Sequence, residues 1–220
     1  LAASIVPIAV ARSTVRIEIP FMIAVTALLF YQGRDGSISL ADGGVLMVAF
    51  AVYMMYLYTM AMKSNVDSDL EEPGLPLGRC LLGAVGGLAL IIAGSNVTVG
   101  AATSIATYAG LSERFIGLTI VALGTSLPEL FTSVAAARRG NADIAIGNIV
   151  GSNIFNILFV VGLSALIIDI PFASAFNFDT YVALGAAVLL LLCVLRTQRL
   201  QRWAGALMLV CYAAYLGYIL

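Results

Sequence analysis

Long apolar runs separated by short polar connections make up most of this sequence. A helix that crosses a membrane needs about 20 mostly apolar residues. After an apolar stub at residues 1–10, the pattern predicts spans near residues 17–31, 43–62, 80–109, 115–137, 144–168, 178–195 and 203–220. The third run is longer than a bilayer requires, so we expect it to be tilted or bent. The pattern therefore predicts an all-α membrane protein, a multi-span helical bundle with seven spans plus an N-terminal helix stub.

The composition indicates the same class of protein. Of the 220 residues, 61% are hydrophobic and 10% are charged, whereas a soluble domain carries about 25% charged residues. Mean hydropathy is +1.04. The formal net charge of −1 offers no basic face for phosphates, which excludes nucleic acid as a partner. We expect the lipid bilayer to surround the chain.

The reactive side chains do not favour catalysis. The sequence has no His, and its three cysteines, Cys80, Cys193 and Cys211, lie in apolar runs without CxxC spacing. This pattern provides neither a nucleophile–base pair nor a His/Cys metal cluster. We therefore expect no enzymatic activity, no cofactor and no disulfide framework.

The connections between the runs predict the topology. Residues 63–76 form the long polar segment, with four acidic residues and two prolines, and we interpret 64–76 as a solvated linker. Seven spans place most basic residues on the side of that linker: Arg12, Arg16, Lys63, Arg79, Arg138, Arg139, Arg196, Arg199 and Arg202. The other side holds Arg34 and Arg114. The positive-inside rule then predicts a cytoplasmic linker and an external C-terminus in the cell (inner) membrane.

Two apolar segments resemble each other. Residues 43–58 (GGVLMVAFAVYMMYLY) resemble residues 204–219 (AGALMLVCYAAYLGYI). The copies are five spans apart, an odd number, so they point in opposite directions, as in the inverted repeats of many secondary transporters. We therefore expect 1–63 to be the tail of a first repeat, with the stub and two spans, and 77–220 to be a second repeat. Residues 78–163 have no counterpart before the first copy, so we expect a partial chain whose missing first-repeat helices are its partners.

One acidic residue stands out within the predicted spans. Between Arg114 and Arg138, Glu129 is the only charged residue, and a charge at the bilayer centre costs about 2.5–3.5 kcal/mol on insertion scales. We therefore expect Glu129 to be the one deeply buried carboxylate of the chain. No Lys or Arg is predicted at matching depth, so a role in cation transport is favoured over a buried ion pair.

The residues before Glu129 strengthen this interpretation. Pro128 breaks or kinks a helix and frees the carbonyl groups near Ala122 and Gly124. Thr125 and Ser126 precede Glu129 by four and three residues, so helical spacing places them on its side. A carboxylate, two hydroxyls and free carbonyls are the oxygen ligands that hard cations prefer.

A second polar group follows in GNIVGSNIFN, residues 147–156. Ser152 and Asn156 are four residues apart and share one helical face, so we expect them to supply further neutral oxygens opposite Glu129. Asn148 and Asn153 are predicted to lie on other faces and to bond neighbouring helices. The short connection ARRGNAD predicts that the two spans are adjacent and antiparallel.

GTSLPE (124–129) followed by GNIVGSNIFN resembles the second alpha repeat of the cation/calcium antiporter superfamily. The resemblance covers residues 78–220 and is strongest to the prokaryotic type of the sodium/calcium exchanger branch. It implies an antiporter of two inverted repeats that moves Na⁺ against Ca²⁺. It also implies that Glu129 is the shared carboxylate and that neutral oxygens come from Thr125, Ser126, Ser152, Asn156 and the Ala122 carbonyl.

Two other functions are compatible with the same residues. A Ca²⁺/H⁺ exchanger would use the same carboxylate, although proton-coupled relatives more often show a GNxxE pattern than GTSLPE. A non-transporting membrane assembly subunit would use the buried polar residues only to join helices. Because Ca²⁺ carries two charges and these spans offer one mid-membrane carboxylate, we expect the 220 residues to supply half of the ion site and to be inactive by themselves.

Overall fold

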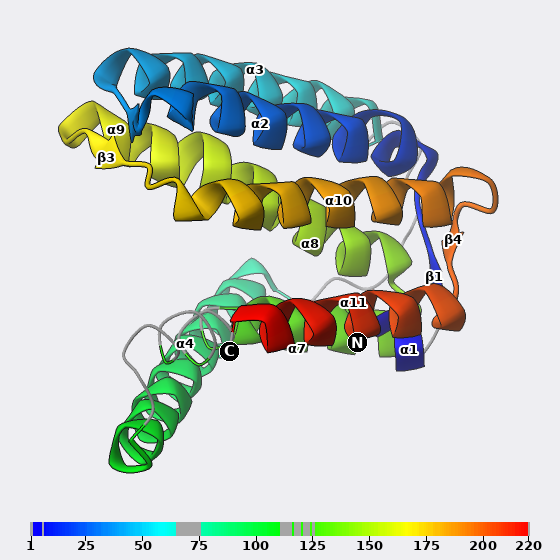
Figure 1. The fold of residues 1–220 in the computed structure, drawn as a ribbon. Helices are drawn as coiled ribbons and strands as arrows, with labels where there is room; N and C mark the ends of the chain where they lie inside the picture. The colour runs from blue at the N-terminus through cyan, green and yellow to red at the C-terminus, as the bar shows by residue number, and fades with distance from the viewer. Residues whose placement is uncertain are drawn as a thin grey trace.

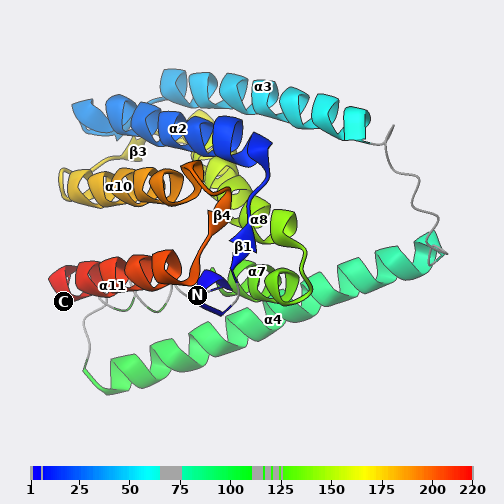
Figure 2. The same ribbon diagram turned by 90° about the vertical axis from the view of Figure 1, so that its right-hand side faces the viewer.

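The computed structural model describes residues 2–5, 7–64, 76–110, 116, 120, 124 and 126–219. In the described residues the chain is a bundle of long helices with four two-residue strands at its ends (Figures 1 and 2). The helices are α1 (Ala2–Ile5), α2 (Ile19–Gln32), α3 (Leu40–Ser64), α4 (Leu77–Tyr108), α7 (Leu127–Arg138), α8 (Ala142–Phe155), α9 (Gly162–Ile167), α10 (Ala175–Leu195) and α11 (Arg202–Ile219). The strands are β1 (Ile8–Ala9), β2 (Ser37–Ile38), β3 (Ile170–Pro171) and β4 (Arg199–Leu200). Where the structure describes whole segments, π-helix continues neighbouring helices at Thr14–Glu18 before α2 and at Asn156–Val161 between α8 and α9.

Most predicted spans appear as helices close to their expected bounds. Five segments are long and apolar enough to cross a membrane: Thr14–Asp35, Leu40–Lys63, Gly78–Tyr108, Ile144–Ile167 and Ala175–Leu195. Helix α11 occupies the predicted span at 203–220 but is not among these five. The predicted span at 115–137 is described in part, and α7 begins only at Leu127. The structure therefore confirms a multi-span helical bundle, while the count of seven is not confirmed. Most of the predicted linker at 64–76 lies outside the described residues.

Elements from the first part of the chain pair with elements from the last part. Strand β1 pairs with β4 and β2 pairs with β3, both antiparallel. The helices follow the same rule, because α1 packs on α11, α9 packs on α3, and α2 packs on α10. The series α1–β1–α2–β2–α3 therefore has the same order of elements as α9–β3–α10–β4–α11. The two series pack in opposite directions, so that the first element of each contacts the last element of the other. Such exchange is expected of two repeats related by a two-fold axis, and it supports the inverted-repeat architecture.

One of these exchanged contacts depends on a glycine. A side-chain carbon at Gly43 of α3 would lie 2.8 Å from the Gly162 carbonyl oxygen and 2.9 Å from the Ala165 side chain. The neighbouring Gly44 has no atom within 4 Å of the equivalent position. The absence of a side chain at Gly43 is therefore what lets α3 approach α9 so closely.

We expect Gly43→Ala to lower the free energy of unfolding by about 1–3 kcal/mol, because overpacking displaces the α9 backbone. Gly44→Ala is the matched control, since it makes the same gain in helix propensity without a clash. Thermal unfolding of the two variants in detergent measures the difference. Equal midpoints for the two variants would contradict the predicted contact.

Helix α8 has one apolar and one polar face. Val150, Ile154 and Leu158 recur every four residues and are all 0% exposed. They face the core shared with α2, α3 and α10. After α7, a tight turn in which Gly140 has a φ of +79° leads into α8, which runs back beside α7 and confirms the predicted antiparallel pair. The polar face of α8 is thereby left for the site.

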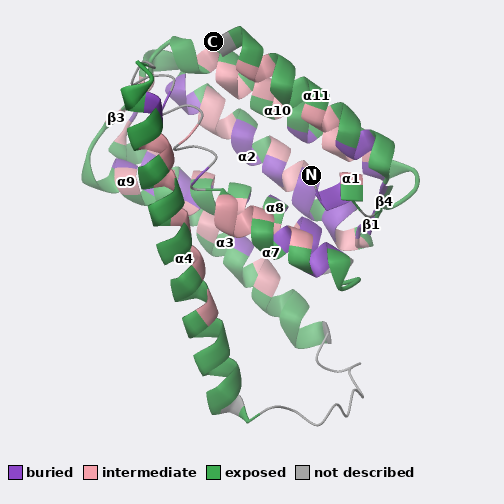
Figure 3. Cartoon of the chain, turned by 90° about the horizontal axis from the view of Figure 1, so that it is seen from below, coloured by how far each residue is buried: buried purple, intermediate pink, exposed green. Residues whose placement is uncertain are grey.

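Helix α4 differs from the others in its surroundings. It runs obliquely to the remaining helices in Figure 2 and is almost entirely exposed in Figure 3. Among the described elements, its substantial contact is with α7. Large apolar side chains such as Leu82 and Leu90 are exposed along it, as expected of a helix that faces lipid.

Candidate ion-binding site

The site begins where α7 begins. Ser126 precedes the first helical residue, and Pro128 lies in the first turn, where a missing N–H costs little. Proline also leaves the carbonyl group four residues earlier without its helical donor. That group belongs to Gly124, and its oxygen accepts a hydrogen bond from the Ser95 hydroxyl of α4 at 2.6 Å. A helix therefore begins beside the predicted proline, and a neighbouring helix satisfies the carbonyl group of Gly124.

One cavity collects the described members of the predicted set. It has a volume of about 400 Å³ and lies between α7 and α8. Ser126 and Glu129 line it from α7, and Ser152 and Asn156 line it from the polar face of α8 and the turn that follows. Thr125 and Ala122, the other two predicted residues, lie outside the described residues. Four of the six predicted residues therefore line one cavity, although they come from two separate segments of the sequence.

The Glu129 carboxylate is half-buried and incompletely bonded. Its Oε2 atom is buried and has no hydrogen-bond partner among the described residues. A buried carboxylate oxygen without a donor or a cation is costly. This atom is the feature of the cavity that most needs a positive charge.

The expectation that Glu129 is the one deeply buried carboxylate is wrong. Glu18 is more buried, at 9% exposure. The predicted span placed Glu18 at a membrane edge, but the helical segment begins earlier, at Thr14, and carries Glu18 inward. The Thr14 hydroxyl donates to Glu18 Oε2 at 3.0 Å. The two carboxylates therefore differ in local bonding, since Glu18 has an internal hydroxyl donor.

The α8 side of the cavity offers neutral oxygens. The Ser152 hydroxyl donates to the Ile149 carbonyl at 3.1 Å, which leaves lone pairs of the hydroxyl oxygen free to accept. Asn156 begins the π-helical segment, a departure from α-helix that is frequent at functional sites. Asn153 also lines the cavity and bonds within its own helix, to Ile149. The prediction that Asn153 bonds a neighbouring helix is therefore wrong, because residues 149, 152, 153 and 156 share one helical face.

Ser133 is a cavity residue that the sequence analysis missed. It follows Glu129 by one helical turn, lines the same cavity and is 1% exposed. The spacing of four residues from Glu129 was the available signal. Asn148 donates to Ser133 from α8, which confirms that Asn148 bonds a neighbouring helix.

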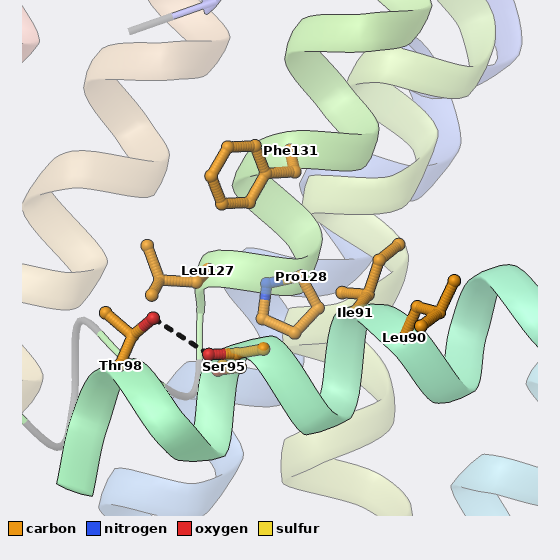
Figure 4. A pocket seen from close by; sticks show the side chains of 8 residues that line it. Leu90, Ile91, Ser95, Thr98, Leu127, Pro128 and Phe131 are labelled. Atoms are coloured by element: carbon orange, nitrogen blue, oxygen red, sulfur yellow. Dashed lines mark hydrogen bonds between the residues drawn. The ribbon is translucent and has the colours of Figure 1, made fainter. Parts of the chain in front are cut away.

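The other face of α7 borders a second, apolar cavity of about 330 Å³ (Figure 4). Leu127, Pro128 and Phe131 line it opposite Leu90 and Ile91 of α4. Both hydroxyl groups in its lining already donate hydrogen bonds. Ser95 donates to the Gly124 carbonyl, and Thr98 donates to the Gly94 carbonyl at 2.8 Å. Because its lining contains no carboxylate, we assign the candidate ion site to the cavity with Glu129.

The Ser95 hydrogen bond predicts a measurable effect on stability. We expect Ser95→Ala to lower the free energy of unfolding by about 1–3 kcal/mol, because it leaves the Gly124 carbonyl group unsatisfied. Ser104→Ala is the matched control on the same helix, since the Ser104 hydroxyl donates only to Gly100 of α4 itself. Thermal unfolding in detergent compares the two, and an equal loss in both would contradict the role of Ser95.

Comparison with known proteins identifies the family of this chain. A sequence profile described as "Sodium/calcium exchanger protein" matches residues 80–220. The chain belongs to the sodium/calcium exchanger family. A protein from Alkalimonas amylolytica with the provisional name antiporter CaxA is 37% identical over 220 residues, which cover 95% of this chain and 69% of that protein. The inner membrane protein YrbG of Escherichia coli is 36% identical over 225 residues, covering 94% of this chain and 67% of YrbG.

A solved structure gives the same result. The sodium-calcium exchanger NCX_Mj, studied after soaking without Na⁺ and Ca²⁺, matches with a TM-score of 0.78 and 29% identity, over 100% of this chain and 70% of its own. The 220-residue chain, as a member of the sodium/calcium exchanger family, is therefore an integral, multi-pass membrane protein with a helical transporter fold. The expectation of the antiporter superfamily, made from two short motifs, is confirmed.

Proposed function

We propose that the protein exchanges Na⁺ for Ca²⁺ across the membrane. In this proposal Glu129 is the carboxylate that both ions use in turn. Ser126, Thr125, Ser152, Asn156 and the Ala122 carbonyl supply neutral oxygens around it. The observation that carries the proposal is the buried Oε2 atom of Glu129, which has no partner in the described part of the chain and lies in a cavity lined by hydroxyl and amide oxygens.

Charge determines how much of the site these residues supply. In the described part of the chain, no group of three or more His, Cys, Asp and Glu side chains is placed to hold a metal ion. One carboxylate balances one Na⁺, but Ca²⁺ carries two charges, and unbalanced buried charge is penalised. We therefore propose that this cavity is half of the ion site and that a second carboxylate comes from other helices of the transporter.

Ca²⁺ uptake into liposomes tests the proposal, with the complete transporter, including the helices that supply the second carboxylate, as the protein; the 220 residues by themselves should take up none. With Na⁺ inside and none outside, we expect rapid Ca²⁺ uptake that stops when internal Na⁺ is replaced by choline. A pH gradient of the same size, imposed without Na⁺, should drive no uptake. Uptake driven only by the pH gradient would identify a Ca²⁺/H⁺ exchanger. No uptake under either gradient, from protein that binds no Ca²⁺, would favour the non-transporting subunit.

A further inference from the structure

We propose that Asn148 is a positioning residue of the ion site, which sets where Glu129 stands relative to the oxygens of α8. This inference rests on the proposed function of the Glu129 cavity. The Asn148 side-chain amide donates to the main-chain oxygen of Glu129 at 3.2 Å and to the Ser133 hydroxyl oxygen at 3.1 Å. A carboxamide nitrogen has two N–H donors, so these two bonds use both.

The two bonds join α8 to α7 at successive turns. Glu129 and Ser133 are four residues apart on α7 and therefore face the same side. Ser133 is 1% exposed, so its hydroxyl has little access to water. One side chain thus holds α7 at the residue that carries the carboxylate and again one turn later. Rotation of the first two turns of α7 would break at least one of these bonds.

Asn148 also lies in line with the residues that α8 and the following turn contribute to the cavity. Asn148, Ser152 and Asn156 lie at intervals of four residues along one row of α8 and the turn that follows. Because a helix is rigid over this length, the contact at Asn148 also fixes how far Ser152 and Asn156 stand from Glu129. Residues that orient metal ligands in this indirect way typically change metal affinity by about 10–100-fold when they are replaced.

Asn148→Leu tests the inference, because leucine fills similar space without an N–H donor. We expect the dissociation constant for Ca²⁺, measured by titration calorimetry on the purified complete transporter, to rise about 10–100-fold. Ser133→Ala should produce a smaller rise, since it removes one of the two acceptors. In the double variant the dissociation constant for Ca²⁺ should rise by less than the product of the two single rises, because both changes remove the same hydrogen bond.

Thr132→Val is the matched control. Thr132 adjoins Ser133 on α7, is exposed, and donates only to the Pro128 carbonyl of its own helix at 2.8 Å. A purely structural role for Asn148 would lower the thermal midpoint of the ion-free protein and leave the dissociation constant unchanged, and that result would overturn the inference. If Glu129→Gln also retains Ca²⁺ binding, the proposed function fails. If only Asn148→Leu retains it, the positioning role fails.

Discussion

Glu129→Gln is expected to abolish Ca²⁺ binding and Na⁺-driven Ca²⁺ uptake while leaving the protein folded and inserted in the membrane. Glutamine keeps the length of the side chain and one carbonyl oxygen, so the cavity retains its shape. It removes the negative charge that the cavity offers to a divalent ion. Because no described residue donates a hydrogen bond to Oε2, neutralisation should not destabilise the ion-free protein. Calorimetric titration and Ca²⁺ uptake by liposomes, both with the complete transporter, measure the two losses.

Two variants show whether the effect belongs to this carboxylate. Glu129→Asp should weaken binding without abolishing it, because the shorter side chain misses the ligand distances of about 2.3–2.6 Å that Ca²⁺ requires. Glu18→Gln neutralises the other buried carboxylate, which the Thr14 hydroxyl already bonds, and should leave Ca²⁺ affinity unchanged. Retained exchange by Glu129→Gln would refute the assignment of the cavity. Equal loss in Glu18→Gln would point to an indirect effect of buried charge.

The sequence was sufficient for those features that depend on local chemistry. Apolar length located five spans to within a few residues, because a bilayer sets the length of a helix. Pro128 indicated the start of α7, because proline is tolerated in the first turn of a helix but gives no N–H to the carbonyl four residues earlier. Helical spacing then placed Ser126 beside Glu129, and Ser152 beside Asn156, and the structure puts all four on one cavity.

Other features depend on contacts between segments far apart in the sequence. The Ser95 hydroxyl reaches the Gly124 carbonyl across 29 positions of the chain, and no local pattern distinguishes Ser95 from the other hydroxyls of α4. The burial of Glu18 depends on a helical segment that begins three residues before the predicted span. The role of Asn148 required the relative rotation of α7 and α8, which packing sets.

Asn156→Asp is expected to strengthen Ca²⁺ binding about 30-fold. Asn156 lines the same cavity as Glu129 and is exposed, so the dielectric constant of water gives a conservative estimate. Two unit charges about 4 Å apart in water interact by about 1 kcal/mol. The double charge of Ca²⁺ therefore gains about 2 kcal/mol from a second carboxylate, which is about 30-fold in the dissociation constant. Na⁺ gains about half of that energy, so affinity for it should rise only about 5-fold.

A double variant that moves the carboxylate shows whether charge or position decides the affinity for Ca²⁺. Glu129→Gln combined with Asn156→Asp keeps one carboxylate but moves it from α7 to the α8 side of the cavity. If the total charge decides affinity, this variant should bind Ca²⁺ as well as the unmodified protein. We expect instead that it binds more weakly, because Asn148 holds the Glu129 end of α7 in place whereas Asn156 begins a π-helical segment. Asn156→Asp should also lower the thermal midpoint of the ion-free protein, since two carboxylates then repel each other, and Ca²⁺ should restore it. If Asn156→Asp leaves Ca²⁺ affinity unchanged, Asn156 does not face the ion, and the α8 half of the proposed site is wrong.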